Sequence, residues 1–222
     1  MSTITLIRHG QAHAFEQDSD RLTDLGWQQA RSLSANPPYD IAFRGSLRRH
    51  RETAEAAGYP NAIEDPGWNE YDATGIIALL AQLTYANPQD PRWLAYQQSP
   101  KDNRTFQRMF EPVMEAWLSG TVHHPVVEPF VSFQSRVSSA FQTAKSCGAT
   151  RIAVFTSGGP IGLCVQQTLN APNKTFLDLN WRVRNTSLTE FTFSTANPDR
   201  CSLDVFNTVP HLEGQASLLT WR

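Results

Sequence analysis

The stretch TLIRHGQ, from Thr5 to Gln11, ends a short apolar run with an arginine, a histidine and a glycine. The run Ile4 to Ile7 has the length and composition of a buried β-strand close to the N-terminus. Arg8 and His9 follow it directly, so two side chains that can carry positive charge stand side by side. They are either surface residues that meet by chance or residues at the end of a sheet strand that bind an anion.

Outward from this strand, helix and strand patterns alternate along the chain. Residues 21–36 are predicted to form a helix with Thr23 as its N-cap. The segment YDIAF, residues 39–43, is predicted to be the next strand, and residues 46–58 the next helix, with Ser46 as its N-cap. Strand, helix, strand, helix is the order of a parallel sheet with helical crossovers.

The alternation is lost between Tyr71 and Val127. Apolar residues at helical spacing, from Ala78 to Leu83 and from Phe106 to Trp117, predict two helices there, and prolines interrupt the connections. We expect a helical insertion at about residues 71–127. A lid over a ligand site and peripheral packing are equally good interpretations of this insertion.

The alternating pattern then resumes. Residues 133–144 carry a helical apolar stripe, RIAVFT at residues 151–156 is predicted to be a buried strand, and SGGPIG begins another helix. SLTEFTF and CSLDVFN are predicted to be two late strands. The predicted fold class is therefore α/β, a three-layer sandwich with a mostly parallel central sheet, in a single domain of residues 1–222.

The composition argues against several classes of protein. A net charge of −2 and a sequence pI of about 6.3 give no basic field that would favour nucleic acid or an anionic membrane. The longest apolar stretch, GIIALLAQL, has about half of the roughly 20 residues that a membrane-spanning helix needs. Three widely spaced cysteines (Cys147, Cys164 and Cys201), with no visible signal peptide, are typical of reduced thiols. We expect a cytoplasmic protein without nucleic-acid or membrane partners.

Polar and glycine-rich segments follow three of the predicted strands. RHGQ follows the first strand, RGSLRRHR the second, and TSGG the strand near residue 155. Ligands in open α/β sheets bind beyond the carboxyl ends of the strands. Arginines there can bind phosphate through charge-assisted hydrogen bonds, and glycines let the amides of a helix N-terminus approach it. Each segment alone has a simpler explanation, such as a solvated helix face, but their convergence predicts an anion site.

In this order the segments resemble the histidine phosphatase superfamily, the phosphoglycerate-mutase-like group. LIRHGQ is similar to the family's opening signature, LTDLGWQQA to its next segment, and DIAFRGSLRRHRETAE to the turn with a second phosphate arginine. In that register the second arginine is Arg49 rather than Arg48 or Arg51. PGWNEYD resembles the acidic segment with the proton donor, and VRNTSLTEF and FNTVPHL resemble the closing strands. The resemblance covers most of the chain, and residues 71–127 least.

The resemblance implies a mechanism and assigns residues to it. His9 would attack phosphorus and become a phosphohistidine. Arg8 and Arg49 would bind the non-bridging oxygens, and Glu70 would protonate the leaving alcohol and then accept a proton from water. No metal or cofactor is required, because the arginines supply the positive charge. Five further positions are expected to lie near the substrate: Gln11, Thr23, Gly26, Ser157 and Gly158.

One position departs from the family pattern. The strand near residue 155 should lead into a second histidine, and Ser157 stands there instead. Losing one such donor typically costs roughly 10²–10³ in rate. Three interpretations follow. Ser157 itself binds the phosphate in a slower or specialised phosphatase, which we favour; another histidine fills the space; or the protein binds a phosphorylated ligand without turnover. Four histidines are available for the second interpretation, and the sequence places none of them there: His50, His123, His124 and His211.

The predicted function is metal-independent hydrolysis of a small phosphomonoester through a phosphohistidine at His9. The alternative is a catalytically impaired phospho-ligand-binding protein of the same fold. A serine hydrolase with Ser157 as nucleophile is disfavoured, because the G-x-S-x-G elbow would need glycine where Phe155 stands. Mutase activity is also disfavoured, because the insertion carries few basic residues and none in a recognisable motif: Arg92, Lys101, Arg104 and Arg108.

Overall fold

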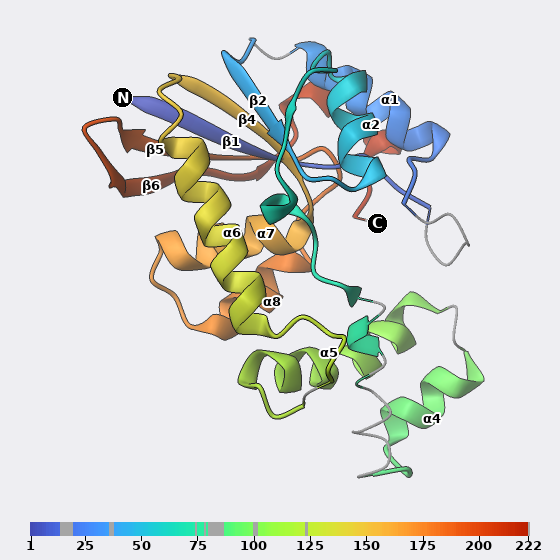
Figure 1. Cartoon of the computed structure of the whole chain (residues 1–222). Helices are drawn as coiled ribbons and strands as arrows, with labels where there is room; N and C mark the ends of the chain where they lie inside the picture. Colours follow the sequence, from blue (N-terminus) through green and yellow to red (C-terminus); the bar gives the residue numbers. More distant parts are fainter. Residues whose placement is uncertain are drawn as a thin grey trace. The chain divides into compact units, whose positions relative to one another are not determined.

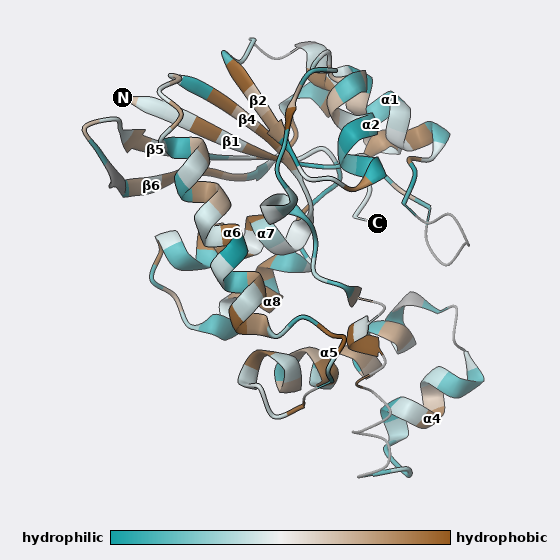
Figure 2. Cartoon of the chain, in the orientation of Figure 1, coloured by the Kyte–Doolittle hydropathy of each residue, from teal (hydrophilic) through white to brown (hydrophobic). Residues whose placement is uncertain are grey.

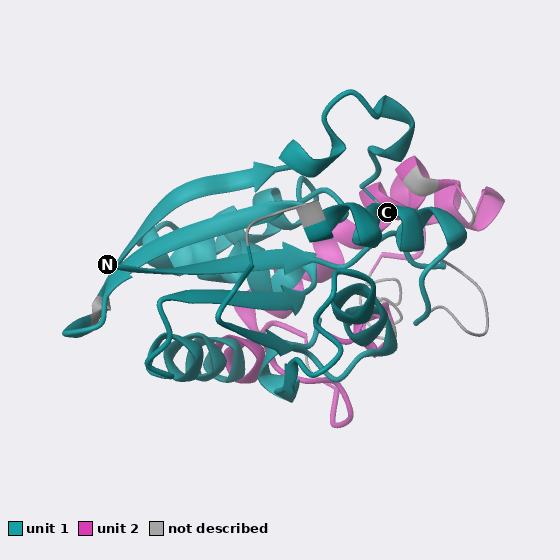
Figure 3. Ribbon diagram, turned by 90° about the horizontal axis from the view of Figure 1, so that it is seen from above, with its two compact units in different colours: residues 1–70, 135–222 teal, residues 71–134 magenta. Residues whose placement is uncertain are grey.

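The computed structural model describes residues 1–13, 20–35, 38–73, 75–77, 79, 87–99, 102–122 and 124–221. The chain divides into two compact units, Met1–Glu70 with Ser135–Arg222, and Tyr71–Gln134, which Figure 3 shows in different colours. The second unit begins at the residue where the predicted insertion begins. Each unit is described by itself below.

The larger unit is built on a six-stranded sheet within the described residues, with the strand order β3-β2-β4-β1-β5-β6 (Figure 1). The strands β3, β2, β4 and β1 run parallel to one another, whereas β5 and β6 form an antiparallel hairpin beside β1. The predicted α/β class with a mostly parallel sheet is confirmed. The strand bounds are Ser2–Arg8 (β1), Ile41–Arg44 (β2), Ile63–Glu64 (β3), Arg151–Thr156 (β4), Leu188–Ser194 (β5) and Asn197–Thr208 (β6).

Helices cover both faces of this sheet. Ile7 pairs in register with Phe155 and packs in one apolar cluster with Ala54 of helix α2. Ile4 points to the opposite face, as does its cross-strand neighbour Phe191, and Phe191 contacts Phe141 of helix α6 with ring centroids 5.2 Å apart. The apolar residues of the strands are brown in Figure 2, between helices of mixed hydropathy. The helix bounds in this unit are Asp24–Ser32 (α1), Arg48–Ala56 (α2), Phe130–Lys145 (α6, whose first residues belong to the other unit), Gly158–Thr168 (α7) and Asn173–Asn180 (α8).

Of the two N-cap residues predicted from the sequence, Thr23 is confirmed and Ser46 is wrong. Thr23 is the N-cap of α1, and its hydroxyl accepts a hydrogen bond from the Gly26 amide. Ser46 does not cap α2, whose N-cap is Leu47 without a side-chain bond. The Ser46 hydroxyl instead accepts a hydrogen bond from Asn69, and the Asp20 carboxylate accepts one from the Arg48 amide at the start of α2.

The smaller unit is helical, with α4 at Pro91–Gln98 and α5 at Asn103–Ser119. Its apolar contacts are largely aromatic: the Trp117 ring lies 5.1 Å from Phe130 and 5.5 Å from Tyr71 between centroids. Helix α5 confirms the second helix predicted in the insertion. In the first predicted helix of the insertion, Leu79 is helical, while Ala78 and Leu83 lie outside the described residues. No helix in the described parts of the chain combines the length and apolarity that crossing a membrane would take.

Candidate active site

Three strands end together at one edge of the sheet, and this places the predicted site residues. Arg8, the last residue of β1, pairs with Thr156, the last residue of β4. Arg44, the last residue of β2, pairs with Phe155 of the same strand. The residues that come next in the chain therefore begin at one edge: His9, Gly45 and Ser157. The register of the sheet explains why segments more than a hundred residues apart can form one site.

His9 is nearly buried, with 7% of its surface exposed, and its ring is fixed by one hydrogen bond. Nδ1 lies 2.7 Å from the carbonyl oxygen of Gly10. A carbonyl oxygen only accepts, so Nδ1 carries the proton and Nε2 of the neutral ring keeps its lone pair. Burial, and then the charges of Arg49 and Arg8, hold the pKa of His9 well below its usual value. The ring is therefore neutral near pH 7 and has one nucleophilic nitrogen.

The backbone around His9 is held by hydrogen bonds from two other segments. The Gly10 amide donates to the Thr53 hydroxyl of α2, at 3.0 Å, and the Asn185 side chain donates to the His9 carbonyl, at 3.1 Å. The Thr186 amide donates to the carbonyls of Arg8 and His9. Thr186 has φ of 55°, a left-handed conformation that is strained for a β-branched residue. Its bonds to the end of β1 stabilise that conformation, so this loop positions His9.

Two glycines allow the loop after His9 to approach helix α1. A Cβ added at Gly10 would lie 2.5 Å from the Gly26 carbonyl oxygen, and one at Gly26 would lie 2.1 Å from the Gln11 carbonyl oxygen. Thr23 also joins this contact, because its hydroxyl donates to the Gln11 side chain at 2.9 Å. The structure thus gives Gly26 a packing role and joins Gln11 to Thr23, while their contact with substrate stays a prediction.

The three arginines at the start of α2 have different environments. Arg48 pairs with Glu52 at 2.6 Å, and Arg51 pairs with Glu55 at 3.7 Å on an exposed face. Arg49 is the one of the three whose charge lowers the pKa of His9, and its side chain is 18% exposed. Arg49 is therefore the arginine of this group that acts on His9, and its contact with phosphate stays a prediction.

Both predicted phosphate arginines also have protein partners. Arg49 pairs with the carboxylate of Asp20 at 2.7 Å, so an incoming phosphate would compete with that carboxylate. Arg8 donates to the carbonyls of Val183 and Trp221, and its charge also lowers the pKa of His9. Arg8 is thus close enough to act on His9 electrostatically, and its direct contact with phosphate stays a prediction.

Glu70 is brought to the same edge by the segment PGWNEYD. Trp68 is fully buried, and its carbonyl accepts a hydrogen bond from Thr156 at the end of β4. Arg136 of α6 donates to the carbonyls of Asn69 and Glu70 and so fixes the backbone. The Glu70 carboxylate accepts a bond from the Gly159 amide in the first turn of α7, at 3.1 Å. The predicted proton donor therefore lies at the N-terminus of α7, bonded to a residue two positions after Ser157.

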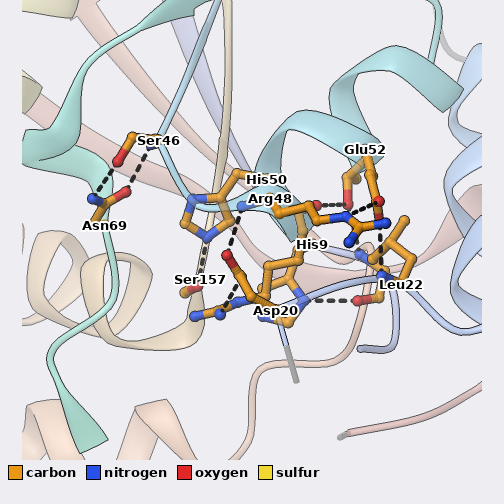
Figure 4. A network of polar contacts seen from close by, with 12 residues as sticks. His9, Asp20, Leu22, Ser46, Arg48, His50, Glu52, Asn69 and Ser157 are labelled. Carbon is orange, nitrogen blue, oxygen red and sulfur yellow. Dashed lines mark hydrogen bonds and ion pairs between the residues drawn. The ribbon is translucent and has the colours of Figure 1, made fainter. Parts of the chain in front are cut away.

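Ser157 is paired with a histidine to which the sequence had given no position. It is the N-cap residue of α7, yet its side chain makes no capping bond. Its hydroxyl lies 2.7 Å from His50 Nε2, and both residues are fully buried (Figure 4). The His50 and His9 rings are 5.8 Å apart between centroids. The sequence offered His50 as one of four available histidines but could not place it, because it is 107 residues from Ser157 and no local pattern joins them.

The other residues considered for the site lie elsewhere or have packing contacts. His211 contacts the Thr186 hydroxyl, His124 belongs to the smaller unit, and His123 lies outside the described residues. A Cβ added at Gly158 would lie 2.8 Å from the Asn180 side chain, so close packing with α8 explains this glycine. Within the described residues, no group of three or more His, Cys, Asp or Glu side chains could hold a metal ion.

With this geometry established, comparison with known proteins identifies the class. The chain belongs to the Histidine phosphatase superfamily (branch 1), whose sequence profile matches residues 4–207. A search of curated proteins finds no match.

Solved structures share the fold at low sequence identity. Bacillus stearothermophilus YhfR has 19% identity and a TM-score of 0.65 over 96% of this chain and 100% of its own. Phosphoserine phosphatase from Entamoeba histolytica has 20% identity and a TM-score of 0.63 over 96% and 100%. Alpha-ribazole phosphatase from Shigella flexneri has 16% identity and a TM-score of 0.63 over 93% and 96%. These likenesses support the phosphoglycerate-mutase-like architecture predicted from the sequence.

Proposed function

We propose that the protein is a metal-independent phosphatase that hydrolyses a small phosphomonoester through a phosphohistidine at His9. The observation that carries this proposal is the state of the His9 ring: it is buried and neutral, with Nδ1 fixed on the Gly10 carbonyl and Nε2 left as a nucleophile. Membership of a phosphatase family supports it. The related Entamoeba histolytica enzyme has been solved with phosphoserine and with 3-phosphoglyceric acid, so a small phosphorylated substrate is a reasonable class here.

In the first step, His9 Nε2 attacks phosphorus in line with the leaving oxygen. The N–P bond forms as the P–O bond to the leaving group breaks, and Glu70 donates its proton to that oxygen. The charge on the non-bridging oxygens is bound by Arg49, and by Arg8 if it leaves its carbonyl partners. The products of this step are a free alcohol, a phosphohistidine and a Glu70 carboxylate.

In the second step, a water molecule attacks phosphorus from the side that the alcohol has left. The Glu70 carboxylate accepts the proton of the water, the O–P bond forms, and the N–P bond to His9 breaks. Orthophosphate leaves, and both His9 and Glu70 return to their starting states. The Gly159 amide holds this carboxyl at the start of α7, and we assign to it the acid role in the first step and the base role in the second.

A phospho-ligand-binding protein is the competing function, and Ser157 is the observation that favours it. It predicts phosphate binding without turnover. A mutase remains disfavoured, because residues 71–127 carry few basic residues and none in a recognisable motif.

A panel of phosphomonoesters, assayed with purified wild type and His9→Ala, separates these functions. We expect wild type to release orthophosphate from at least one member, and His9→Ala to lose at least about 10³-fold in kcat, because the nucleophile is gone. Alkaline quenching of wild type should trap a phosphoenzyme that acid destroys, as expected of a phosphohistidine. Equal rates for the two proteins across the panel would refute the enzyme and favour the binding protein.

A further inference from the structure

The buried pair formed by His50 and Ser157 is the feature that the proposed mechanism leaves unused. His50 lies in the first turn of α2 and Ser157 at the start of α7, and both are fully buried. Among the described residues, His50 Nδ1 has no hydrogen-bond partner, so the Ser157 hydroxyl is the one hydrogen-bond partner of this ring. A Cβ added at Gly45 would lie 2.2 Å from Nδ1, which shows that the ring fills space left open by this glycine.

The protonation of His50 decides what the Ser157 hydroxyl can do. Burial, and then the charges of Arg49 and Arg44, lower the pKa of His50 well below its usual value, and His9 on the facing loop is neutral. The neutral ring carries one proton. A buried N–H without an acceptor is rarer in proteins than an acceptor without a donor, so the proton belongs on Nε2. Nε2–H then donates to the Ser157 oxygen, and the single hydroxyl hydrogen of Ser157 is free to donate elsewhere.

We propose that His50 is a positioning residue that directs the Ser157 hydroxyl toward the phosphoryl group attacked by His9. Ser157 then supplies the hydrogen bond that the family resemblance places on a second histidine. The pair lies beside the His9 ring, and two features there favour an anion: the N-terminus of a helix of 11 residues and the charge of Arg49. This inference rests on the proposed phosphatase function, and it goes further by assigning a role to a residue to which the family resemblance gives none.

Substitutions at both positions test the pair. With p-nitrophenyl phosphate as the probe, Ser157→Ala should lower kcat by roughly 10²-fold with a smaller effect on KM, because the donor acts on the transferring group. His50→Leu should cost a similar factor, whereas His50→Gln, which keeps an N–H near the position of Nε2, should stay within about fivefold of wild type. The double variant Ser157→Ala with His50→Leu should be no worse than about threefold below the worse single variant, because the two residues act as a unit. Arg51→Gln, on the exposed face of the same helix, serves as the control.

A packing role and a hydrogen-bonding role make opposite predictions. If His50→Gln and His50→Leu lose activity equally, or if the losses of the two sites multiply in the double variant, the pair does not act as proposed. Thermal unfolding of each variant shows whether it folds. Long-range ¹H–¹⁵N spectra of wild type read the tautomer without any substitution, and a proton on Nδ1 of His50 would overturn the inference.

Orthophosphate binding separates this inference from the proposed function. If wild type matches His9→Ala in turnover, the phosphatase fails as a function. The pair then still predicts that orthophosphate binds about tenfold more weakly to Ser157→Ala and to His50→Leu than to wild type or His50→Gln. Equal phosphate affinity in all four proteins would refute the pair whether or not the protein is an enzyme.

Discussion

The fully buried His50 and the partly buried His211 each contact a hydroxyl, and only His50 lies in an environment suited to chemistry. His50 Nε2 is 2.7 Å from Ser157, and His211 Nε2 is 3.0 Å from Thr186. In both rings Nδ1 is buried without a hydrogen-bond partner, among the residues described. Burial lowers both pKa values, to about 4 for His211. Contact geometry therefore does not distinguish a catalytic pair from a structural one, although His50 is the more deeply buried of the two rings.

The surroundings of the two pairs do distinguish them. The charges of Arg49 and Arg44 lower the pKa of His50 further, and its ring lies beside that of His9. The pKa of His211 is lowered by burial alone. Thr186, the partner of His211, has a left-handed backbone that is bonded to the end of β1. The His50 pair thus lies in a cationic site, and the His211 pair supports a strained loop. The charges around a buried histidine are more informative than its hydrogen bond.

The largest effect should come from removing the charge of Arg49, which distinguishes the surroundings of His50 from those of His211. We expect Arg49→Gln to lower kcat/KM by roughly 10²–10³, because a preorganised charge on the phosphoryl oxygens is lost. Arg51→Gln removes the same charge from the same helix, but on a side chain that is 50% exposed and pairs with Glu55, so it should stay within about twofold of wild type. Steady-state kinetics of the two variants measure the contrast, and equal losses would mean that the cationic surroundings of the pair are incidental.

The strands and the site were predictable to different degrees, and for physical reasons. The apolar run before Arg8, and the return of the pattern at residues 151–156, predicted neighbouring parallel strands, because fully buried strands have a local signature. The ends of those strands then located His9 and Ser157 at one edge. Thr23 was correctly predicted as an N-cap because capping involves residues within one helical turn.

Long-range side-chain contacts explain what the sequence could not reveal. Ser46 was predicted to cap α2, but Asn69, 23 residues away, bonds with it instead. Asp20 replaces it at the start of that helix, from 28 residues away, and also binds Arg49. His50 reaches Ser157 only because α2 and α7 begin at the same edge of the sheet. Such pairs depend on the assembled sheet, and no periodicity or spacing in the sequence contains them.

A smaller effect, on stability rather than rate, is expected at the structural pair. The pKa of His211 is lowered from 6.5 to about 4 on folding, so the unfolded chain binds more protons between these values. The free energy of unfolding should therefore fall as the pH drops from about 6.5 toward 4, and the contribution of this group is complete above 6.5. In His211→Gln this part of the pH dependence should disappear.

Denaturant unfolding of wild type and His211→Gln at pH 7 and pH 5 measures this difference. At pH 7 the variant should be about 1 kcal/mol less stable, because a buried hydrogen bond is weakened. Its kcat should change far less than that of Ser157→Ala. An undiminished pH dependence in the variant would place the acid sensitivity in other buried histidines, and a 10²-fold loss of kcat would remove the distinction between the two pairs.

The smallest effect is expected from the Asp20 carboxylate, which forms an ion pair with Arg49. Asp20 pairs with Arg49 at 2.7 Å, and its side chain is 37% exposed, so the interaction is partly screened. Asp20→Asn removes the charge but keeps an oxygen that can cap the Arg48 amide, since asparagine caps helices about as well as aspartate. We expect KM for a phosphomonoester to fall about two- to fivefold, with kcat little changed, because the phosphate no longer competes with a carboxylate for Arg49. The decrease in KM should be smaller at high salt.

A KM that rises instead would show that Asp20 orients Arg49 for phosphate rather than competing with it. This carboxylate would then belong to the cationic site that distinguishes the His50 pair.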